Sequence, residues 1–520
     1  MGAYRVKNTI KNTVSGFIFR IIGLVMPFIV RTVMIKKLGI DYLGLNSLFS
    51  SILQVLSLSE LGFSSAIVFA MYKPIAEGDE DRICVILKLL RNAYYIIGTV
   101  ILVVGCAIIP AVPYLIKGGE YPNDINLYIL YGIFLLNTVI SYFFFAYKGL
   151  LLTAHQKSSV ENNIFSIVNL LMYVAQIVFL FVFSNYYIYI ICLPVATLII
   201  NLVRVVFVNK MYPNYKCKGI IDSELRKSVF RNIGSLIGHR LSFIIVVSIN
   251  NIIISMINGL EMLAIYNNYY YILNALIGII SVFHSSATAS IGNSIVVDSV
   301  EKNYNDFNKL TFINVWIVGW MSICLVCLYQ HFMQIWIGDD GVLSFWTMML
   351  FVLLFYLWKF KDILPTYKDA AGMWKADFWK PYTVIFVSLP LSILLTKYIG
   401  VGGTLIAMIS GVFVVSFPWE THVFFKYYFK KSPKSYYLRM VIYSLVVVAV
   451  GAGTYLICYF IPPQGYGWFA LKCVICLIIP NLLFFLLSFR TPEFKYIIEK
   501  IRNIFARKNK IVDNSDANNV

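Results

Sequence analysis

Charged residues are scarce in this chain of 520 residues, at 13% of the total, and acidic residues are the scarcer kind, with 25 Asp and Glu against 43 Lys and Arg. Soluble domains carry about 25% charged residues. Apolar residues make up 59% of the chain, and the mean hydropathy is +0.77. This composition excludes a soluble globular domain and predicts that most of the chain lies in lipid.

A cleavage site of small residues is also absent after the first apolar run, which Arg20 and Arg31 interrupt. A cleavable signal peptide needs such a site and an uninterrupted apolar centre. We therefore expect the first run to stay in the protein as a membrane helix.

No histidine partner is expected for two cysteine pairs, Cys324 with Cys327 and Cys473 with Cys476. Their spacing is typical of metal or redox sites in cytosolic proteins, but both pairs lie inside apolar runs. We expect these cysteines to pack as small apolar side chains, and we expect no resident metal or cofactor.

Long apolar runs are abundant, and a run of about 20 residues is long enough to cross the hydrocarbon core. We predict an all-α integral membrane protein with about fourteen transmembrane helices. Breaks are expected between Ile35 and Leu43 and between Ser184 and Tyr187. The predicted helix centres are Leu24, Leu58, Val103, Leu136, Leu171, Ala196, Val246, Leu276, Trp320, Leu353, Val387, Ser410, Val447 and Ile475.

Most Lys and Arg residues fall on alternate connections, on the same side as the N-terminus. Positive residues stay in the cytoplasm, so both termini are expected there in a multi-pass plasma-membrane protein. The net charge of +18 then reflects topology and attraction to anionic membrane lipids, and we expect no nucleic-acid partner. Only four Lys or Arg residues fall on the connections expected outside the cell: Lys36, Lys37, Lys117 and Lys397.

The chain repeats itself at a constant offset of 220 residues, the separation of Arg20 and Arg240. Two repeats of about six spans each predict two six-helix lobes related by a pseudo-two-fold axis along the membrane normal, an arrangement known in secondary transporters. The expected lobes are residues 1–215 and 216–430, followed by two extra helices and a basic cytoplasmic tail in residues 431–520. The matching polar pairs are Arg20 and Arg240, Asn12 and Asn232, Lys11 and Arg231, and Ser15 and Ser235.

Arginines within apolar runs are the main candidates for a binding site. Arg31 shares a helix face with Arg20, and His239 lies beside Arg240. If the first helices of the two lobes face each other, the arginines point into a central cavity, where guanidiniums can grip a phosphate or pyrophosphate in bidentate fashion. The alternative is that these side chains snorkel to the membrane surfaces, as we expect for Arg204.

Glu60 lies near the middle of the second predicted span. A carboxylate at that depth must pair, take up a proton or bind an ion, so Glu60 is either the partner of a cavity arginine or a site of ion coupling. Glu420, His422 and His284 are weaker candidates of the same kind.

Several stretches together resemble the polysaccharide flippases (Wzx-like) of the MOP exporter superfamily, in particular those of Gram-positive capsule and surface-polysaccharide loci. The resemblance covers nearly the whole chain. The matching stretches are Leu56-Ser-Leu-Ser-Glu-Leu-Gly-Phe-Ser-Ser-Ala66, Tyr266-Asn-Asn-Tyr269, Ser285-Ser-Ala-Thr-Ala-Ser-Ile-Gly-Asn293, Trp336-Ile-Gly338 and Tyr367-Lys-Asp-Ala-Ala-Gly372.

The resemblance implies a MATE/MOP-like fold with two lobes in a V and alternating access through a cationic cavity. The implied cargo is an undecaprenyl-pyrophosphate-linked oligosaccharide, moved to the outer leaflet for surface or capsular polysaccharide export. Arg20, Arg31 and Arg240 would hold the pyrophosphate, and a polysaccharide polymerase and glycosyltransferases would be partners.

The chain departs from the family pattern in its seventh helix. Relatives often carry an acidic residue where this chain has Asn250, followed by Asn251. Coupling to a Na⁺ or H⁺ gradient through this position is therefore in question, and Glu60 becomes the better candidate.

Three other functions stay open. Only family motifs separate a lipid II flippase from a flippase for undecaprenyl-pyrophosphate-linked oligosaccharides. A multidrug exporter of the same fold would favour carboxylates and aromatic residues in its cavity. A membrane glycosyltransferase or polymerase would need outer loops bearing carboxylates or a catalytic base, and the outer loops of this chain are short. We therefore expect a transporter with no catalytic residues.

Overall fold

The computed structural model describes residues 22–60, 63–373, 375–462, 465–496 and 498–499. Helices are the only regular elements in this part of the chain, as predicted. By packing, the chain divides into unit 1 (Met1–Tyr271 and Phe378–Gly411) and unit 2 (Ile272–Asp377 and Val412–Val520). The predicted lobes rest on sequence repetition, so their boundaries stay a prediction.

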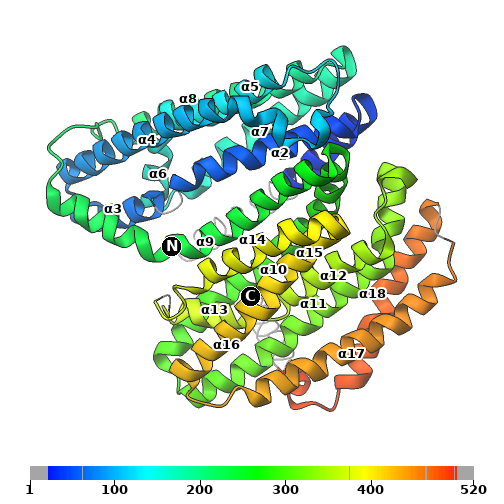
Figure 1. Cartoon of the computed structure of the whole chain (residues 1–520). Coiled ribbons are helices and arrows are strands. Elements are labelled where there is room, and N and C mark those ends of the chain that lie inside the picture. The colour runs from blue at the N-terminus through cyan, green and yellow to red at the C-terminus, as the bar shows by residue number, and fades with distance from the viewer. Residues whose placement is uncertain (1–21, 61–62, 374, 463–464, 497, 500–520) are drawn as a thin grey trace, which may run out of the picture. The chain divides into compact units, whose positions relative to one another are not determined.

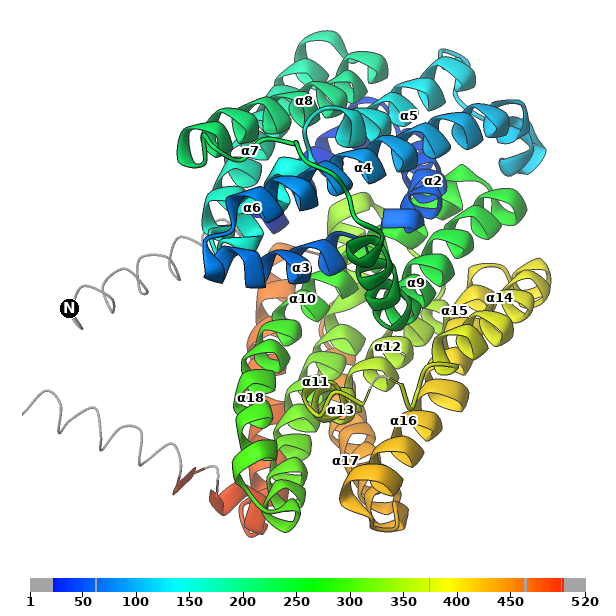
Figure 2. The same cartoon turned by 90° about the vertical axis from the view of Figure 1, so that its left-hand side faces the viewer.

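The described part of unit 1 begins with a helical segment at residues 22–37, and α4, α5, α8 and α7 of this unit lie side by side (Figures 1 and 2). Its other helices include α14 and α15, which form a tightly packed pair. The elements are α2 (Ile40–Leu56), η1 (Ser57–Glu60), α3 (Phe63–Glu77), α4 (Glu80–Ile108), η2 (Ile109–Leu115), η3 (Lys117–Gly119), α5 (Leu127–Phe143), α6 (Tyr147–Ala154), α7 (Ser158–Phe183), α8 (Tyr186–Met211), α9 (Ser223–Asn258), the first part of α10 (Leu260–Val297), α14 (Lys380–Ile399) and α15 (Val401–Ser410).

Unit 2 takes in the rest of α10, and its long helix α11 packs against both α17 and α18 (Figure 1). The other elements of this unit are α11 (Val300–Ile337), η4 (Asp339–Gly341), α12 (Phe345–Lys359), α13 (Ile363–Ala370), η5 (Gly411–Ser416), α16 (Phe417–Phe424), η6 (Phe425–Phe429), α17 (Lys434–Tyr459) and α18 (Tyr466–Ser488).

Within the described residues, nine helices are long and apolar enough to cross a membrane, and the bent pair α5 and α6 makes a tenth if it forms one span. These account for most of the predicted centres. The remaining centres fall on shorter helical segments, in residues 22–37, at the α2–α3 break, in the apolar part of α9 and in α12.

The expected breaks have clear local causes. Gly39 separates the segment 22–37 from α2 with a φ of 119°, a conformation that favours glycine. Ser184 ends α7, and the side chain of Asn185 then caps α8 by accepting from the amides of Tyr187 and Ile188.

A second glycine break supports the internal repeat. Gly259 separates α9 from α10 with a φ of 99°, and the offset from Gly39 to Gly259 equals the offset from Arg20 to Arg240. The following helices differ, because α2 ends at Leu56 whereas α10 runs on to Val297.

The helix expected to be centred on Leu58 is interrupted there, because α2 ends at Leu56. Ser57 lies just beyond the end of α2, and its hydroxyl donates to the carbonyl of Leu53 at 2.9 Å. Serine side chains compete with the helix for backbone hydrogen bonds in this way, and here the chain continues as the 3₁₀ turn η1.

Gly44 provides a test of the packing between α2 and the start of α10. A Cβ atom at Gly44 would lie 2.3 Å from the carbonyl oxygen of Leu260, so the two backbones approach too closely for any other residue. We expect Gly44→Val to destabilise the protein by about 1–3 kcal/mol through overpacking, measured as a lower midpoint of thermal unfolding in detergent.

The matched control is Gly132→Ala on α5, where a Cβ would meet nothing within 4 Å. Equal unfolding midpoints for the two variants would contradict the close approach at Gly44.

Candidate substrate and ion sites

Several predicted site residues lie outside what the structure describes. Arg20 precedes the first described residue. Arg240 and His239 lie on α9, and Glu60 ends η1, but their side chains are also outside the described part. The convergence of Arg20 with Arg240 and the coupling role of Glu60 stay predictions.

Arg31 is the predicted cation whose surroundings are described, and it is held by α10. Its Nη1 donates to Oδ1 of Asn268 at 2.8 Å, and its guanidinium carbon lies 5.1 Å from the ring centroid of Tyr271. Tyr271 is fixed in turn, since its hydroxyl donates to the carbonyl of Leu24 at 2.5 Å. Arg31 is thus anchored inside unit 1, and the described partners of its guanidinium carry no negative charge.

Asn267, which precedes Asn268 on α10, contacts the predicted ion residue Asn251. Asn267 donates from Nδ2 to Oδ1 of Asn251 at 3.3 Å, and Asn251 donates to the hydroxyl of Ser51 on α2 at 2.8 Å. Consecutive helix positions point about 100° apart, so Asn267 and Asn268 reach different neighbours. This Asn pair therefore connects Arg31, a predicted substrate residue, to Asn251, a predicted ion residue.

Asn250 faces α14 and is fully buried. Its Oδ1 accepts from the hydroxyl of Ser392 at 2.7 Å, and one turn further along α14 the hydroxyls of Thr396 and Thr404 lie 2.7 Å apart. The amide nitrogen of Asn250 has no hydrogen-bond partner among the described residues. The site offers neutral oxygens, which bind a cation without taking up a proton.

Arg204 is buried against a carboxylate, and its place at the cytoplasmic face stays a prediction. Its Nε donates to Oε2 of Glu161 on α7 at 3.0 Å, and its Nη1 donates to Oδ1 of Asn201 at 2.5 Å. Glu161 lies in the first turn of α7 with its side chain 21% exposed, so the charge of Arg204 is neutralised near one end of this helix.

Unit 2 contains a group of buried ion pairs that the sequence analysis did not predict. Lys361 contacts Glu420 at 2.5 Å, with both side chains 5% exposed. Lys368 contacts Asp377 at 2.7 Å, with exposures of 3% and 0%. Of these four residues only Glu420 is a candidate from the sequence, and a weak one, because its partner Lys361 lies far away in the chain.

A histidine joins this group. His284 on α10 lies 3.7 Å from Asp362, which also contacts Lys359 at 2.8 Å. On its other side the ring nitrogen Nε2 lies 2.9 Å from Oδ1 of Asn314, whose amide donates to the carbonyls of Lys359 and Phe360. The cluster ties α10, α11 and α12 together around one titratable ring.

A family model described as "Polysaccharide biosynthesis protein" matches residues 6–289. No curated protein matches the chain.

Solved structures with a similar fold include the lipid II flippase MurJ in an inward closed conformation, with 16% identity, a TM-score of 0.68 and coverage of 92% of this chain and 98% of that chain. An inward-facing multidrug resistance MATE family transporter of the MOP superfamily has 13% identity, a TM-score of 0.61 and coverage of 78% and 94%. The chain therefore has the MATE/MOP-like fold expected from its sequence, and at these identities the likeness shows the fold alone.

The buried pair of Lys361 and Glu420 can be tested by a double-mutant cycle. We expect Lys361→Met alone to cost about 3–5 kcal/mol, because it removes the Lys361 cation from the buried carboxylate of Glu420. The double variant Lys361→Met with Glu420→Gln is expected to recover much of this loss, measured by thermal or denaturant unfolding in detergent.

Lys73→Met is the control, since Lys73 and Glu77 form an exposed pair at 3.8 Å whose loss costs about 0–1 kcal/mol. A double variant that loses the full sum of the two single effects would show that the pair does not interact.

Proposed function

Because this chain belongs to the polysaccharide biosynthesis protein family, we propose that it is a flippase for undecaprenyl-pyrophosphate-linked oligosaccharides. It would carry repeat units from the cytoplasmic to the outer leaflet by alternating access, for the export of surface or capsular polysaccharide. The fold is shared with a lipid II flippase and with MATE transporters, which supports a transporter and not an enzyme.

The observation that carries the proposal is that Arg31 has no carboxylate among its described partners. Several buried cations contact carboxylates: Arg204 contacts Glu161 in unit 1, and Lys361 and Lys368 contact Glu420 and Asp377 in unit 2. Arg31 instead has a neutral amide and an aromatic ring as its partners. A cation held in place without a counter-ion inside a membrane protein is suited to an anionic ligand.

We propose that Arg20 and Arg240, with His239 nearby, complete the pyrophosphate site. Several guanidiniums can each grip a phosphoryl group in bidentate fashion, which a lysine does less well. The undecaprenyl chain would stay in the bilayer while the glycan crosses with the pyrophosphate.

Coupling to an ion gradient is proposed to use the Asn251 and Asn250 sites. Amide and hydroxyl oxygens do not titrate near neutral pH, so these sites favour Na⁺ over H⁺. Glu60 remains the alternative coupling residue. The chain of contacts from Arg31 through Asn268 and Asn267 to Asn251 supports communication between cargo and ion.

The excess of Lys and Arg on one side of the predicted spans supports a plasma-membrane protein with both termini in the cytoplasm. Membrane lipids would surround it, and a polysaccharide polymerase and glycosyltransferases would act before and after it. A multidrug exporter is disfavoured by the cationic character of Arg31, because organic cations need carboxylates or aromatic faces.

The test follows lipid-linked repeat units in a host that lacks this protein and receives the wild type, Arg31→Ala or Asn268→Asp. The wild type should move the glycan to the outer leaflet. Arg31→Ala should reduce outer-leaflet glycan about tenfold or more, because a charge-assisted hydrogen bond contributes about 1.5–3 kcal/mol. Asn268→Asp should fold normally yet fail in the same way, since its carboxylate would neutralise Arg31.

The control is Arg82→Ala, which breaks a partly exposed pair with Asp222 and should leave transport intact at equal abundance. Full transport by Asn268→Asp would contradict the anion site. Repeat units that reach the outer leaflet without the protein but stay unpolymerised would favour a polymerase, and a defect confined to lipid II would favour that cargo.

A further inference from the structure

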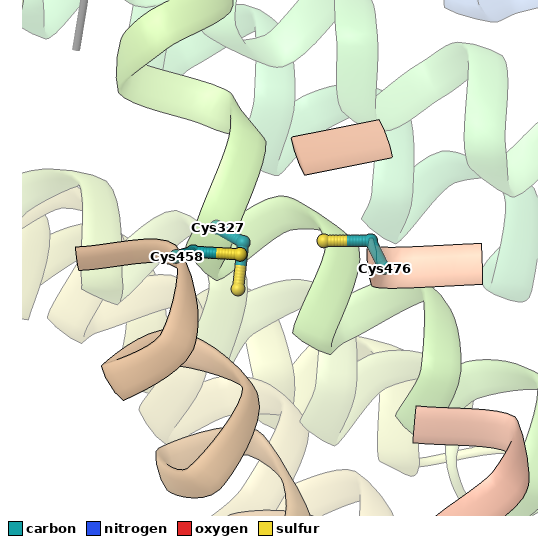
Figure 3. A group of neighbouring side chains, drawn as sticks. All are labelled: Cys327, Cys458 and Cys476. Atoms are coloured by element: carbon teal, nitrogen blue, oxygen red, sulfur yellow. The ribbon is translucent and has the colours of Figure 1, made fainter. Parts of the chain in front are cut away.

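Three cysteines from three helices of unit 2 meet in its interior. The Sγ atoms of Cys327 on α11, Cys458 on α17 and Cys476 on α18 all lie within 4.8 Å of one another, and all three residues are buried. Figure 3 shows the sulfur atoms of Cys327 and Cys458 side by side, with that of Cys476 pointing toward them. These side chains form the thiol cluster.

The thiol cluster is positioned by a break in the hydrogen bonding of α18. Residue 480 is proline and has no amide to offer the carbonyl of Cys476, so this carbonyl is free to accept elsewhere. It accepts from Nε1 of Trp320 on α11 at 2.9 Å and from the thiol of Cys324 at 3.8 Å. Cys476 is therefore held against α11 at a fixed position along that helix.

Two polar residues lie one turn from the cluster toward the α17–α18 connection. His331 follows Cys327 by four positions on α11, and Lys472 precedes Cys476 by four positions on α18, so each shares a helix face with a cluster cysteine. His331 is 3% exposed, and neither ring nitrogen has a hydrogen-bond partner of good geometry in the described part, although the backbone of Gly465 lies within reach.

Lys472 is 6% exposed, and no described carboxylate forms an ion pair with it. It lies within electrostatic reach of both the Cys458 thiol and His331. An ammonium group in this position is costly beside neutral thiols, because a buried charge needs an opposite charge close by. Thiolates in the cluster would supply that charge.

We propose that the thiol cluster binds a divalent thiophilic metal ion of the Zn²⁺ class. Three thiolates are soft ligands that select such ions, and His331 is available as a fourth ligand after a change of rotamer. The charges of the ion and of Lys472 together balance the three thiolates, so the site is neutral within the apolar bundle. Binding releases the three thiol protons to solvent.

This site revises the expectation that both cysteine pairs serve only as apolar packing. Each pair contributes its second member, Cys327 or Cys476, and the third ligand comes from Cys458, which belongs to neither pair. A metal ion here would clamp α11, α17 and α18 together. Such a clamp is independent of the proposed transport of lipid-linked glycans.

The test uses the purified full-length chain in detergent, stripped with a chelator and titrated with Cd²⁺ as the probe. We expect thiolate-to-metal charge-transfer absorption that saturates at about one Cd²⁺ per chain, as for a closed structural site. The variants Cys327→Ser, Cys458→Ser and Cys476→Ser should each lose it. The control variants Cys473→Ser, from the same sequence pair as Cys476, and Cys106→Ser, at an exposed cysteine of unit 1, should keep it, and Lys472→Met should weaken it.

A second measurement on the wild type covers variants that fail to fold. Cysteine alkylation followed by mass spectrometry should show Cys327, Cys458 and Cys476 protected in the presence of Zn²⁺ and alkylated faster after chelation. Absence of saturable Cd²⁺ binding, equal loss in the control variants, or a disulfide within the cluster of the purified protein would overturn the proposal.

Discussion

Hydrocarbon offers no hydrogen bonds, so each polar group that a membrane helix carries inward needs a partner within the protein. The adjacent residues Asn267 and Asn268 on α10 provide such partners for the helices around them. Asn268 accepts from Arg31, and Asn267 donates to Asn251, which in turn reaches Ser51. Arg31 and Asn251, the proposed substrate and ion residues, are thereby fixed relative to each other by one turn of one helix, and movement of α10 would disturb both.

The same requirement distinguishes structural charges from functional ones. Lys361 and Lys368 each contact a buried carboxylate, so their charges are neutralised where they lie. Arg31 and Lys472 have no described carboxylate partner, so each needs a negative charge from another source. For Arg31 that charge would come from a pyrophosphate, and for Lys472 from the thiolates of a metal site. A cation without a described carboxylate partner thus identifies both proposed sites.

The sequence predicted the fold well, because hydropathy and glycine breaks are local signals. The breaks near Gly39 and Ser184 lie where they were expected, and most predicted helix centres lie in long apolar helices. Partners distant in the chain were not predictable, since neither Lys361 nor Glu420 has a local feature that identifies the other. The pairing of Arg204 with Glu161 was not predictable for the same reason, and Cys458 belongs to no motif. The roles of Arg20 and Glu60 stay predictions.

The most direct test of the anion site is a leaflet assay in liposomes with the purified chain and a fluorescent oligosaccharide linked to undecaprenyl pyrophosphate. The same glycan on an uncharged lipid of equal length serves as comparison. The account predicts that the protein accelerates transfer of the pyrophosphate-linked glycan between leaflets and leaves the uncharged lipid near its spontaneous rate. Equal acceleration of both lipids, or of neither, would contradict a site built around an unneutralised Arg31.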